Sequence, residues 1–96
     1  MIKKPPHPGS VFRETVMKPL NLSVSETARM PGVSRKTLSD FVHEKTALSP
    51  RLALRIGRAT ETSPEHWMNL QVKLTLRHAS RREPKDVTVF PKKPLK

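Results

Sequence analysis

The stretch Glu26–Phe41 reads ETARMPGVSRKTLSDF, and the proline and glycine at its centre decide the fold. Apolar residues recur at helical spacing on both sides of this break. Two helices that cross at about 90–120° through a short turn need a small residue where they touch, a turn residue that tolerates positive φ and an apolar anchor on the second helix. Ala28, Gly32 and Leu38 provide these features. The stretch therefore predicts a helix-turn-helix over about residues 23–43.

Helix-start signals on both sides of this motif predict an all-α domain. Ser23 and Glu26 form a capping box, Ser34 is expected to cap the helix that follows it, and serine followed by proline precedes two later apolar runs. Pro19 is expected to end the first helix, because proline restricts the residue before it. Together these signals predict five helices, over residues 8–17, 24–30, 35–43, 50–60 and 64–77.

Apolar residues at helical spacing predict which faces of the last two helices are buried. The expected core residues are Leu52, Ala53, Leu54, Ile56 and Ala59 in the fourth helix, and Trp67, Met68, Leu70 and Leu74 in the fifth.

The chain divides into three parts by composition. Residues 1–7 read as an extended arm, residues 8–79 as the helical domain and residues 80–96 as a basic tail. Within the tail, Val87–Phe90 is a strand-like run of β-branched and aromatic residues. The predicted fold is thus a five-helix domain with a basic tail, in which Val87–Phe90 is a candidate short strand.

The charge balance indicates a polyanionic partner. Among 96 residues, 19 Lys and Arg face 8 Asp and Glu, for a formal net charge of +11. Such a balance is typical of proteins that bind nucleic acid or an anionic membrane surface. Residues 9–70 hold nine basic against six acidic side chains, whereas residues 71–96 hold eight against two. A nearly balanced domain with basic ends favours nucleic acid, with no membrane partner.

Several classes of activity find no support in the sequence. There is no cysteine, and no signal peptide or membrane-spanning run is recognisable, so a cytoplasmic, nucleoid-associated protein is expected. The four histidines lack metal-ligand spacing, and no nucleophile, histidine and carboxylate form a catalytic pattern. The sequence therefore predicts a binding protein that is not an enzyme and uses no cofactor or metal.

The buried face of the motif's second helix fixes which side chains point outward. If Leu38 and Phe41 face the core, the opposite side of the helix faces solvent. The first residues of such a helix reach base edges in the major groove, where arginine and lysine donate to guanine O6 and N7. The preceding helix can direct its N-terminus at a phosphate. The candidate DNA-binding residues are Ser23, Ser25, Ser34, Arg35, Lys36, Thr37, Ser39, Asp40 and Lys45.

Over roughly residues 7–78, the chain resembles the HigA-type antitoxins, which belong to the Xre helix-turn-helix group and are related to the lambdoid phage repressors. The segments that carry this resemblance, in order and spacing, are HPGSVF, MKPLNLSVSETA, PGVSRKTLSDFV, LSPRLALRIGRA and TSPEHWMNLQ.

The resemblance implies a five-helix repressor domain that forms a homodimer on a palindromic operator and represses its own operon. It also implies a protein partner, a RelE/HigB-like toxin that acts as an mRNA endoribonuclease. The family's base-contacting positions fall on Ser34, Arg35, Lys36, Thr37 and Ser39, and its dimer contacts on Trp67, Leu70 and Leu74.

Several positions depart from the family pattern, among them Val24, Pro31 and His66, and two alternative functions stay open. The family commonly has Asn-Gly after the recognition helix, where His43 and Glu44 stand here, so this turn is expected to close in another way. The first alternative is a stand-alone Xre-type repressor without a toxin. The second, from another class, is an RNA-associated or protein-interaction module that works through its basic tail. An adjacent gene for a small basic toxin would favour the antitoxin.

Overall fold

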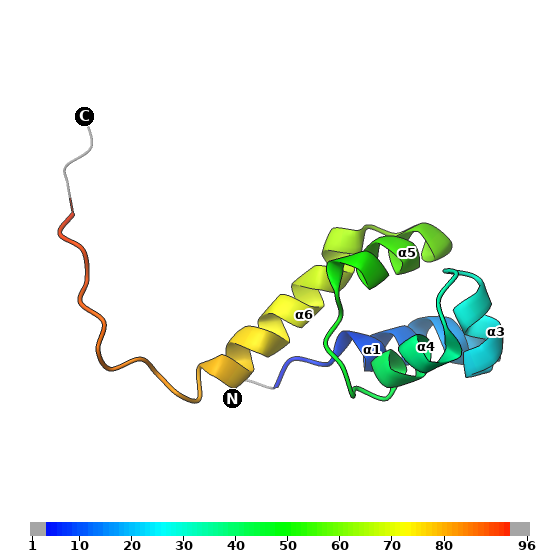
Figure 1. Ribbon diagram of the computed structural model, residues 1–96, viewed down its shortest axis with the longest axis horizontal. Helices are drawn as coiled ribbons and strands as arrows, with labels where there is room; N and C mark the ends of the chain where they lie inside the picture. Colours follow the sequence, from blue (N-terminus) through cyan, green and yellow to red (C-terminus); the bar gives the residue numbers. More distant parts are fainter. Residues whose placement is uncertain (1–3, 93–96) are drawn as a thin grey trace.

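The computed structural model describes residues 4–92, and in this part of the chain the secondary structure is entirely helical (Figure 1). The all-α prediction is therefore confirmed. The helical segments are α1 (Pro8–Phe12), η1 (Arg13–Met17), α2 (Lys18–Leu20), α3 (Val24–Arg29), α4 (Arg35–Val42), α5 (Pro50–Thr60) and α6 (Pro64–Ala79).

The first three segments form one continuous helix, and the prediction that Pro19 ends it is wrong. The stretch η1 is a π-helical turn, in which the backbone N–H of Lys18 donates to the carbonyl of Arg13, five residues earlier. This wider turn accommodates the proline ring, which lacks a donor and would clash with a carbonyl in a regular α-helix. The helix continues to Leu20 and ends where Asn21 adopts a left-handed conformation, with φ of 51°.

Serine side chains cap the later helices as predicted. The hydroxyls of Ser23, Ser34, Ser49 and Ser63 each accept a hydrogen bond from a backbone N–H in the first turn that follows. The first helix has a cap that the sequence did not reveal. There, His7 Nδ1 accepts from the N–H of Gly9 at 2.9 Å, and Nε2 donates to the carbonyl of Thr46 at 3.0 Å.

The core lies where the first helix, α4, α5 and α6 meet. Phe12 is in its centre, with its ring centroid 5.8 Å from that of Phe41 and 5.7 Å from that of Trp67. Leu38 and Ile56 complete the centre and are fully buried. Since these residues come from four different helices, the aromatic cluster fixes α4 relative to the rest of the domain.

Gly9 allows α1 to approach α4 closely. A Cβ atom at this position would fall well inside contact distance of the backbone carbonyl group of Phe41. Nearby, Arg13 Nη1 donates to the carbonyl of Val42 at 2.6 Å, at the end of α4. The first helix therefore supports the C-terminal end of α4 from behind.

The buried face of α5 differs from the prediction. Leu52, Ala53 and Ile56 are buried, but Leu54 is 63% exposed and Ala59 also faces solvent. Two residues span about 200° around an α-helix, so Leu54 cannot share a face with Leu52 and Ile56. Helical geometry thus places Leu54 on the outer surface.

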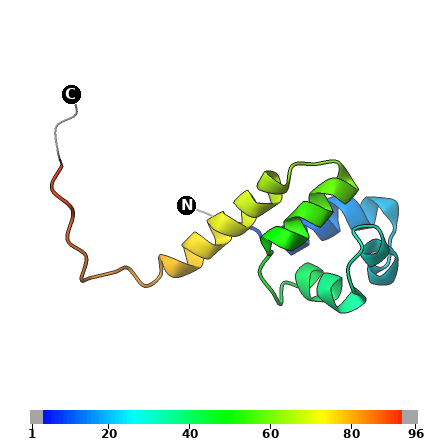
Figure 2. The same cartoon turned by 45° about the horizontal axis from the view of Figure 1, so that its top comes forward.

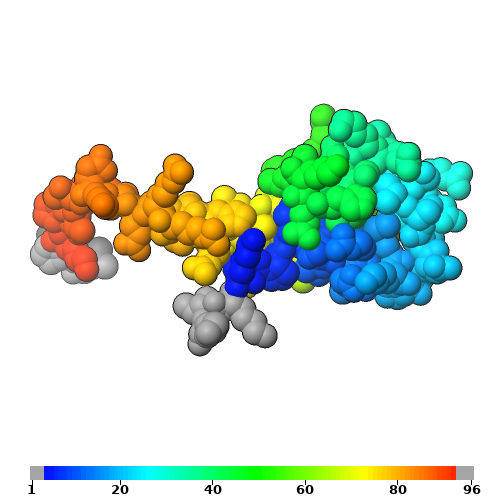
Figure 3. All heavy atoms as spheres, turned by 90° about the horizontal axis from the view of Figure 1, so that it is seen from below, coloured from blue at the N-terminus to red at the C-terminus, as the bar shows by residue number. Residues whose placement is uncertain are grey.

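The chain leaves the helical body after α6. Helices α5 and α6 pack side by side, and α6 extends beyond α5 toward the tail (Figures 1 and 2). Residues 80–92 are exposed and follow an extended path away from the body (Figure 3). Val87–Phe90 forms no strand here, and Phe90 is 88% exposed. Within residues 4–92, no helix combines the length and apolar character needed to cross a bilayer.

Candidate nucleic-acid interface

Helices α3 and α4 and the turn between them form the predicted helix-turn-helix. Ala28 is 3% exposed at the helix contact, and Leu38 is fully buried. Gly32 has φ of +73°, a left-handed conformation that a residue with a Cβ adopts only with strain. The three features inferred from the sequence are therefore present, and they fix the direction of α4.

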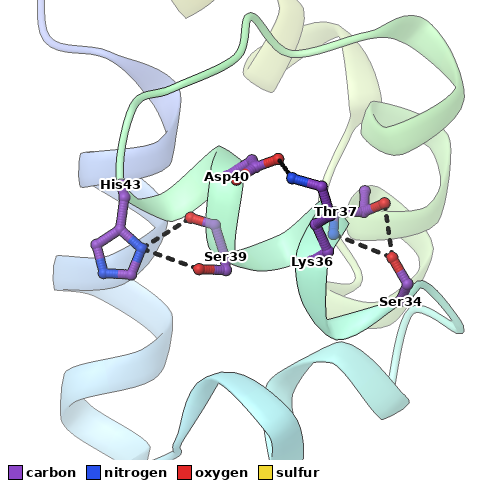
Figure 4. A network of polar contacts seen from close by, with 6 residues as sticks. All are labelled: Ser34, Lys36, Thr37, Ser39, Asp40 and His43. Atoms are coloured by element: carbon purple, nitrogen blue, oxygen red, sulfur yellow. Dashed lines mark hydrogen bonds and ion pairs between the residues drawn. The ribbon is translucent and has the colours of Figure 1, made fainter.

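A row of polar side chains covers the outer face of α4. Leu38, Phe41 and Val42 are buried on the inner face, with no more than 1% exposure each. On the outer face and at the helix entrance, Figure 4 shows a polar network that involves Ser34, Lys36, Thr37, Ser39, Asp40 and His43. Arg35 is exposed at the first position of the helix. The structure thus brings the predicted recognition residues onto one surface.

The first turn of α4 uses some of these groups structurally. Ser34 Oγ accepts from the N–H of Thr37 at 3.0 Å and donates to Thr37 Oγ1 at 2.8 Å. Both hydroxyls therefore hold the entrance of the helix, and their predicted DNA contacts stay predictions. Arg35, in contrast, takes part in none of the ion pairs formed among residues 4–92.

Two further contacts connect residues one turn apart on this face. Lys36 Nζ lies 3.0 Å from Asp40 Oδ2. With its proton on Nδ1, His43 donates to the carbonyl of Ser39 at 2.8 Å, while Ser39 Oγ lies 3.2 Å from the same nitrogen. Asp40 is the acidic member of the face, and its contact with Lys36 offsets part of the positive charge there.

The C-terminus of α4 closes without the glycine that is common in the family. Glu44 takes the left-handed conformation itself, with φ of 63°. Its N–H donates to the carbonyl of Phe41 at 3.1 Å, and the N–H of Lys45 donates to the carbonyl of Asp40 at 2.8 Å. This pair of bonds is a Schellman motif. It places Lys45 in an exposed position immediately beyond the C-terminal end of α4.

At the start of α3, the capping box occupies part of the predicted phosphate site. Glu26 accepts from the N–H of Ser23 at 2.9 Å, and Ser23 Oγ accepts from the N–H of Glu26 at 3.1 Å. The bond from the N–H of Ser23 is the main cause that lowers the pKa of Glu26, and hydrogen bonding with the Ser23 side chain is the second. The carboxylate is therefore charged at neutral pH. Ser25 is exposed beside this box. A phosphate bound here would lie beside the Glu26 carboxylate, which already accepts from the N–H of Ser23.

Sequence reasoning missed an arginine that holds the turn of the motif. Arg55, on α5, donates through Nη1 to the carbonyls of Pro31 at 3.0 Å and Gly32 at 3.3 Å. Arg51 lies one turn earlier and lines a surface hollow with Ser34. The spacing of four residues between the two arginines was a visible signal, but only the fold brings α5 next to the turn.

Two of the three residues expected at a dimer contact are buried within their own protomer. Trp67 is 2% exposed and Leu74 is 4% exposed, because both pack into the core of their own protomer. They have almost no surface left for a second chain, which corrects the expectation for these two residues. Leu70 is only partly buried and keeps its place in that prediction.

The fold and the outer face of α4 together define a helix-turn-helix protein of the phage-repressor type. No protein-family model matches the chain, but individual relatives do. One is an uncharacterized HTH-type transcriptional regulator of Haemophilus influenzae, 32% identical over 76 residues, which are 79% of this chain and 71% of the relative. Another is virulence-associated protein A of Dichelobacter nodosus, 35% identical over 71 residues, 73% of this chain and 70% of the relative.

Solved structures give the same result. The antitoxin HigA of Pseudomonas aeruginosa with the higBA promoter is 36% identical, with a TM-score of 0.77 over 80% of this chain and 84% of that one. The antitoxin GraA in complex with its operator is 35% identical, with a TM-score of 0.76 over 83% and 81%. The chain belongs to the HigA-type group of Xre helix-turn-helix proteins.

Proposed function

We propose that this protein binds operator DNA as a homodimer, inserts α4 into the major groove and represses its own operon. The observation that carries the proposal is the outer face of α4, which is polar and accessible while its inner face is anchored in the core. The solved relatives HigA and GraA, with a promoter and an operator respectively, support it.

In this arrangement the residues of the motif have distinct roles. We expect Arg35 to donate to guanine at a base edge, because it stands at the first position of α4 and is exposed. Ser25 and Lys45, which are exposed at the two ends of the motif, are placed for phosphates. Arg51 joins them as a phosphate contact beside the entrance of α4.

The dimer contact we propose uses the outer side of α6. Val72 is 47% exposed and Leu76 is 64% exposed, and they are one helical turn apart on this side. Burial of these side chains against a second copy would remove apolar surface from water and would support binding to a two-fold symmetric site.

We further propose that the protein is an antitoxin that neutralises a RelE/HigB-like toxin and has no enzymatic activity of its own. Relatives named antitoxin support this function. A stand-alone repressor is the alternative, supported by relatives named only as transcriptional regulators. Co-expression with the product of the adjacent gene distinguishes the two, because an antitoxin co-purifies with that product and restores growth.

A footprint of the region upstream of its own gene tests operator binding. The wild-type protein protects a palindromic segment. The double variant Arg35→Ala and Lys36→Ala keeps its helicity, as measured by circular dichroism, and loses preference for that segment. A double variant that still protects the same segment would show that α4 is not the recognition helix.

A further inference from the structure

The ion pair between Lys36 and Asp40 lies in the middle of the outer face of α4. The Lys36 side chain is 85% exposed, and that of Asp40 is 23% exposed. The residues of α4 that are buried, Leu38, Phe41 and Val42, lie on its inner face. Figure 4 shows the ammonium of Lys36 and the carboxylate of Asp40 directed at each other. The pair therefore stands at the place where base edges would pass.

The stability of the helix does not explain this placement. The N-terminus of a helix carries partial positive charge and favours acidic residues, whereas its C-terminus favours basic ones. In α4 the lysine occupies the first turn and the aspartate the last, and the helix has no acidic residue in its first turn and no basic one in its last. The order Lys then Asp is also the weaker orientation for a pair four residues apart. An exposed pair of this kind contributes little to folding.

The pair matches the major-groove edge of a G·C base pair. There, guanine presents the acceptors N7 and O6, and cytosine presents the donor N4 next to them. O6 and N4 are joined by a Watson–Crick N–H···O bond of about 2.9 Å. Lys36 Nζ and Asp40 Oδ2 form a donor and an acceptor 3.0 Å apart. The two pairs of atoms therefore have the same spacing, and the donor of each pair faces the acceptor of the other.

An A·T pair fits this arrangement less well. Its amino donor, adenine N6, stands between two acceptors, adenine N7 and thymine O4. A carboxylate that accepts from N6 would also face the lone pair of N7. Only the G·C edge places both acceptors on the side of the ammonium and leaves the donor to the carboxylate.

We propose that Lys36 and Asp40 act as one unit that reads a single G·C pair in each operator half-site, with the ammonium on guanine O6 and N7 and the carboxylate on cytosine N4. This inference rests on the proposed binding of DNA by α4. In the free protein Lys36 and Asp40 bind each other. Because this ion pair is weak, both groups can bind the base edges in its place when DNA arrives. Asp40 also repels phosphates, so it lowers affinity for DNA of unrelated sequence.

Selection of duplexes from a randomised pool by the full-length protein provides the test. The selected half-site is then substituted at one base pair at a time, and affinities are measured for the wild type, Lys36→Ala and Asp40→Ala. Glu44→Ala is the matched control, because it removes a carboxylate just beyond the same helix. The two variants that lose a carboxylate, Asp40→Ala and Glu44→Ala, are both expected to bind random DNA more tightly. Of these two, only Asp40→Ala should lose discrimination at one G·C position, on the order of tenfold.

The outcomes separate this inference from the proposed function. Lys36→Ala should lose preference at the same base pair, and the double variant should lose no more than either single one. The inference is overturned if Asp40→Ala and Glu44→Ala behave alike, or if the position that Asp40→Ala affects is an A·T pair. Operator binding stands in both cases. If the wild type shows no sequence preference at all, the proposed function fails with it.

Discussion

Single residues decide where α4 lies and how it is held. Gly9 permits the close approach of α1 to the carbonyl end of α4, and Gly32 permits the positive φ of the turn. Arg55 then donates to the two carbonyls of that turn. None of these residues lies on the outer face of α4, yet each determines the position of that face.

Gly9→Ala is expected to lower the free energy of unfolding by about 1–3 kcal/mol, the usual cost of overpacking, because the new Cβ would overlap the backbone of Phe41. Chemical denaturation measures this loss. Ser25→Ala, an exposed substitution on α3, serves as the control and should change stability little. Equal stability of Gly9→Ala and the wild type would show that α1 and α4 are less closely packed than described.

Arg55→Ala is expected to weaken operator binding more than Arg58→Ala, measured by fluorescence anisotropy. Both variants remove one positive charge from α5, but only Arg55 bonds to the turn of the motif. The difference therefore reports the orientation of α4 and not the net charge. If the two variants lose the same affinity, the bonds of Arg55 to the turn have no role in recognition.

At the scale of elements, the residues at helix ends determine where the helices begin and end. Four serines begin helices, and Asn21, Glu44 and Glu61 take left-handed conformations at the ends of helices. Helices as short as α3, with its six residues, are marginal in isolation and depend on such caps and on packing. The capping box of α3 is thus part of the recognition motif, although it contacts its own backbone.

The capping box predicts a dependence of stability on pH. The pKa of Glu26 is lowered from 4.5 chiefly by the N–H of Ser23. The folded state therefore favours the charged carboxylate, and its contribution is present above the ordinary pKa and lost as the pH falls through the lowered one. The stability difference between the wild type and Glu26→Ala should be full at pH 7 and shrink in acid. Glu83→Ala, in the exposed tail, should show no such difference. A difference that is constant with pH would contradict the assignment.

At the scale of the whole molecule, a compact helical body carries an exposed basic tail. Residues 81–96 contain six Lys and Arg and two Asp and Glu, and residues 81–92 are exposed outside the helices. Arg77 and Leu74, near the end of α6, are the last residues of the chain that are at least partly buried among those described. Residues 81–92 therefore add charge to the molecule without adding to its core.

Deletion of residues 81–96 is expected to leave the unfolding temperature nearly unchanged and to make DNA binding less sensitive to salt. Each phosphate contact that is lost reduces the slope of log affinity against log salt by about 0.9. Titrations at several salt concentrations measure the slope, and a full-length variant with Arg81, Arg82 and Lys85 changed to glutamine separates charge from length. Loss of helicity in the truncated protein would show that the tail is structural.

The sequence by itself determined the local features of this protein: the capping serines, the turn at Gly32 and the buried face of α4. These depend on side chains within a few positions of one another, so their spacing is visible in the chain. The structure added one local feature, the π-helical turn that carries the first helix past Pro19. Only the tertiary structure decided that Arg55 holds the turn of the motif and that Gly9 meets the backbone of Phe41. Each of these contacts joins residues that are far apart in the chain, so it depends on how the helices of the whole domain pack.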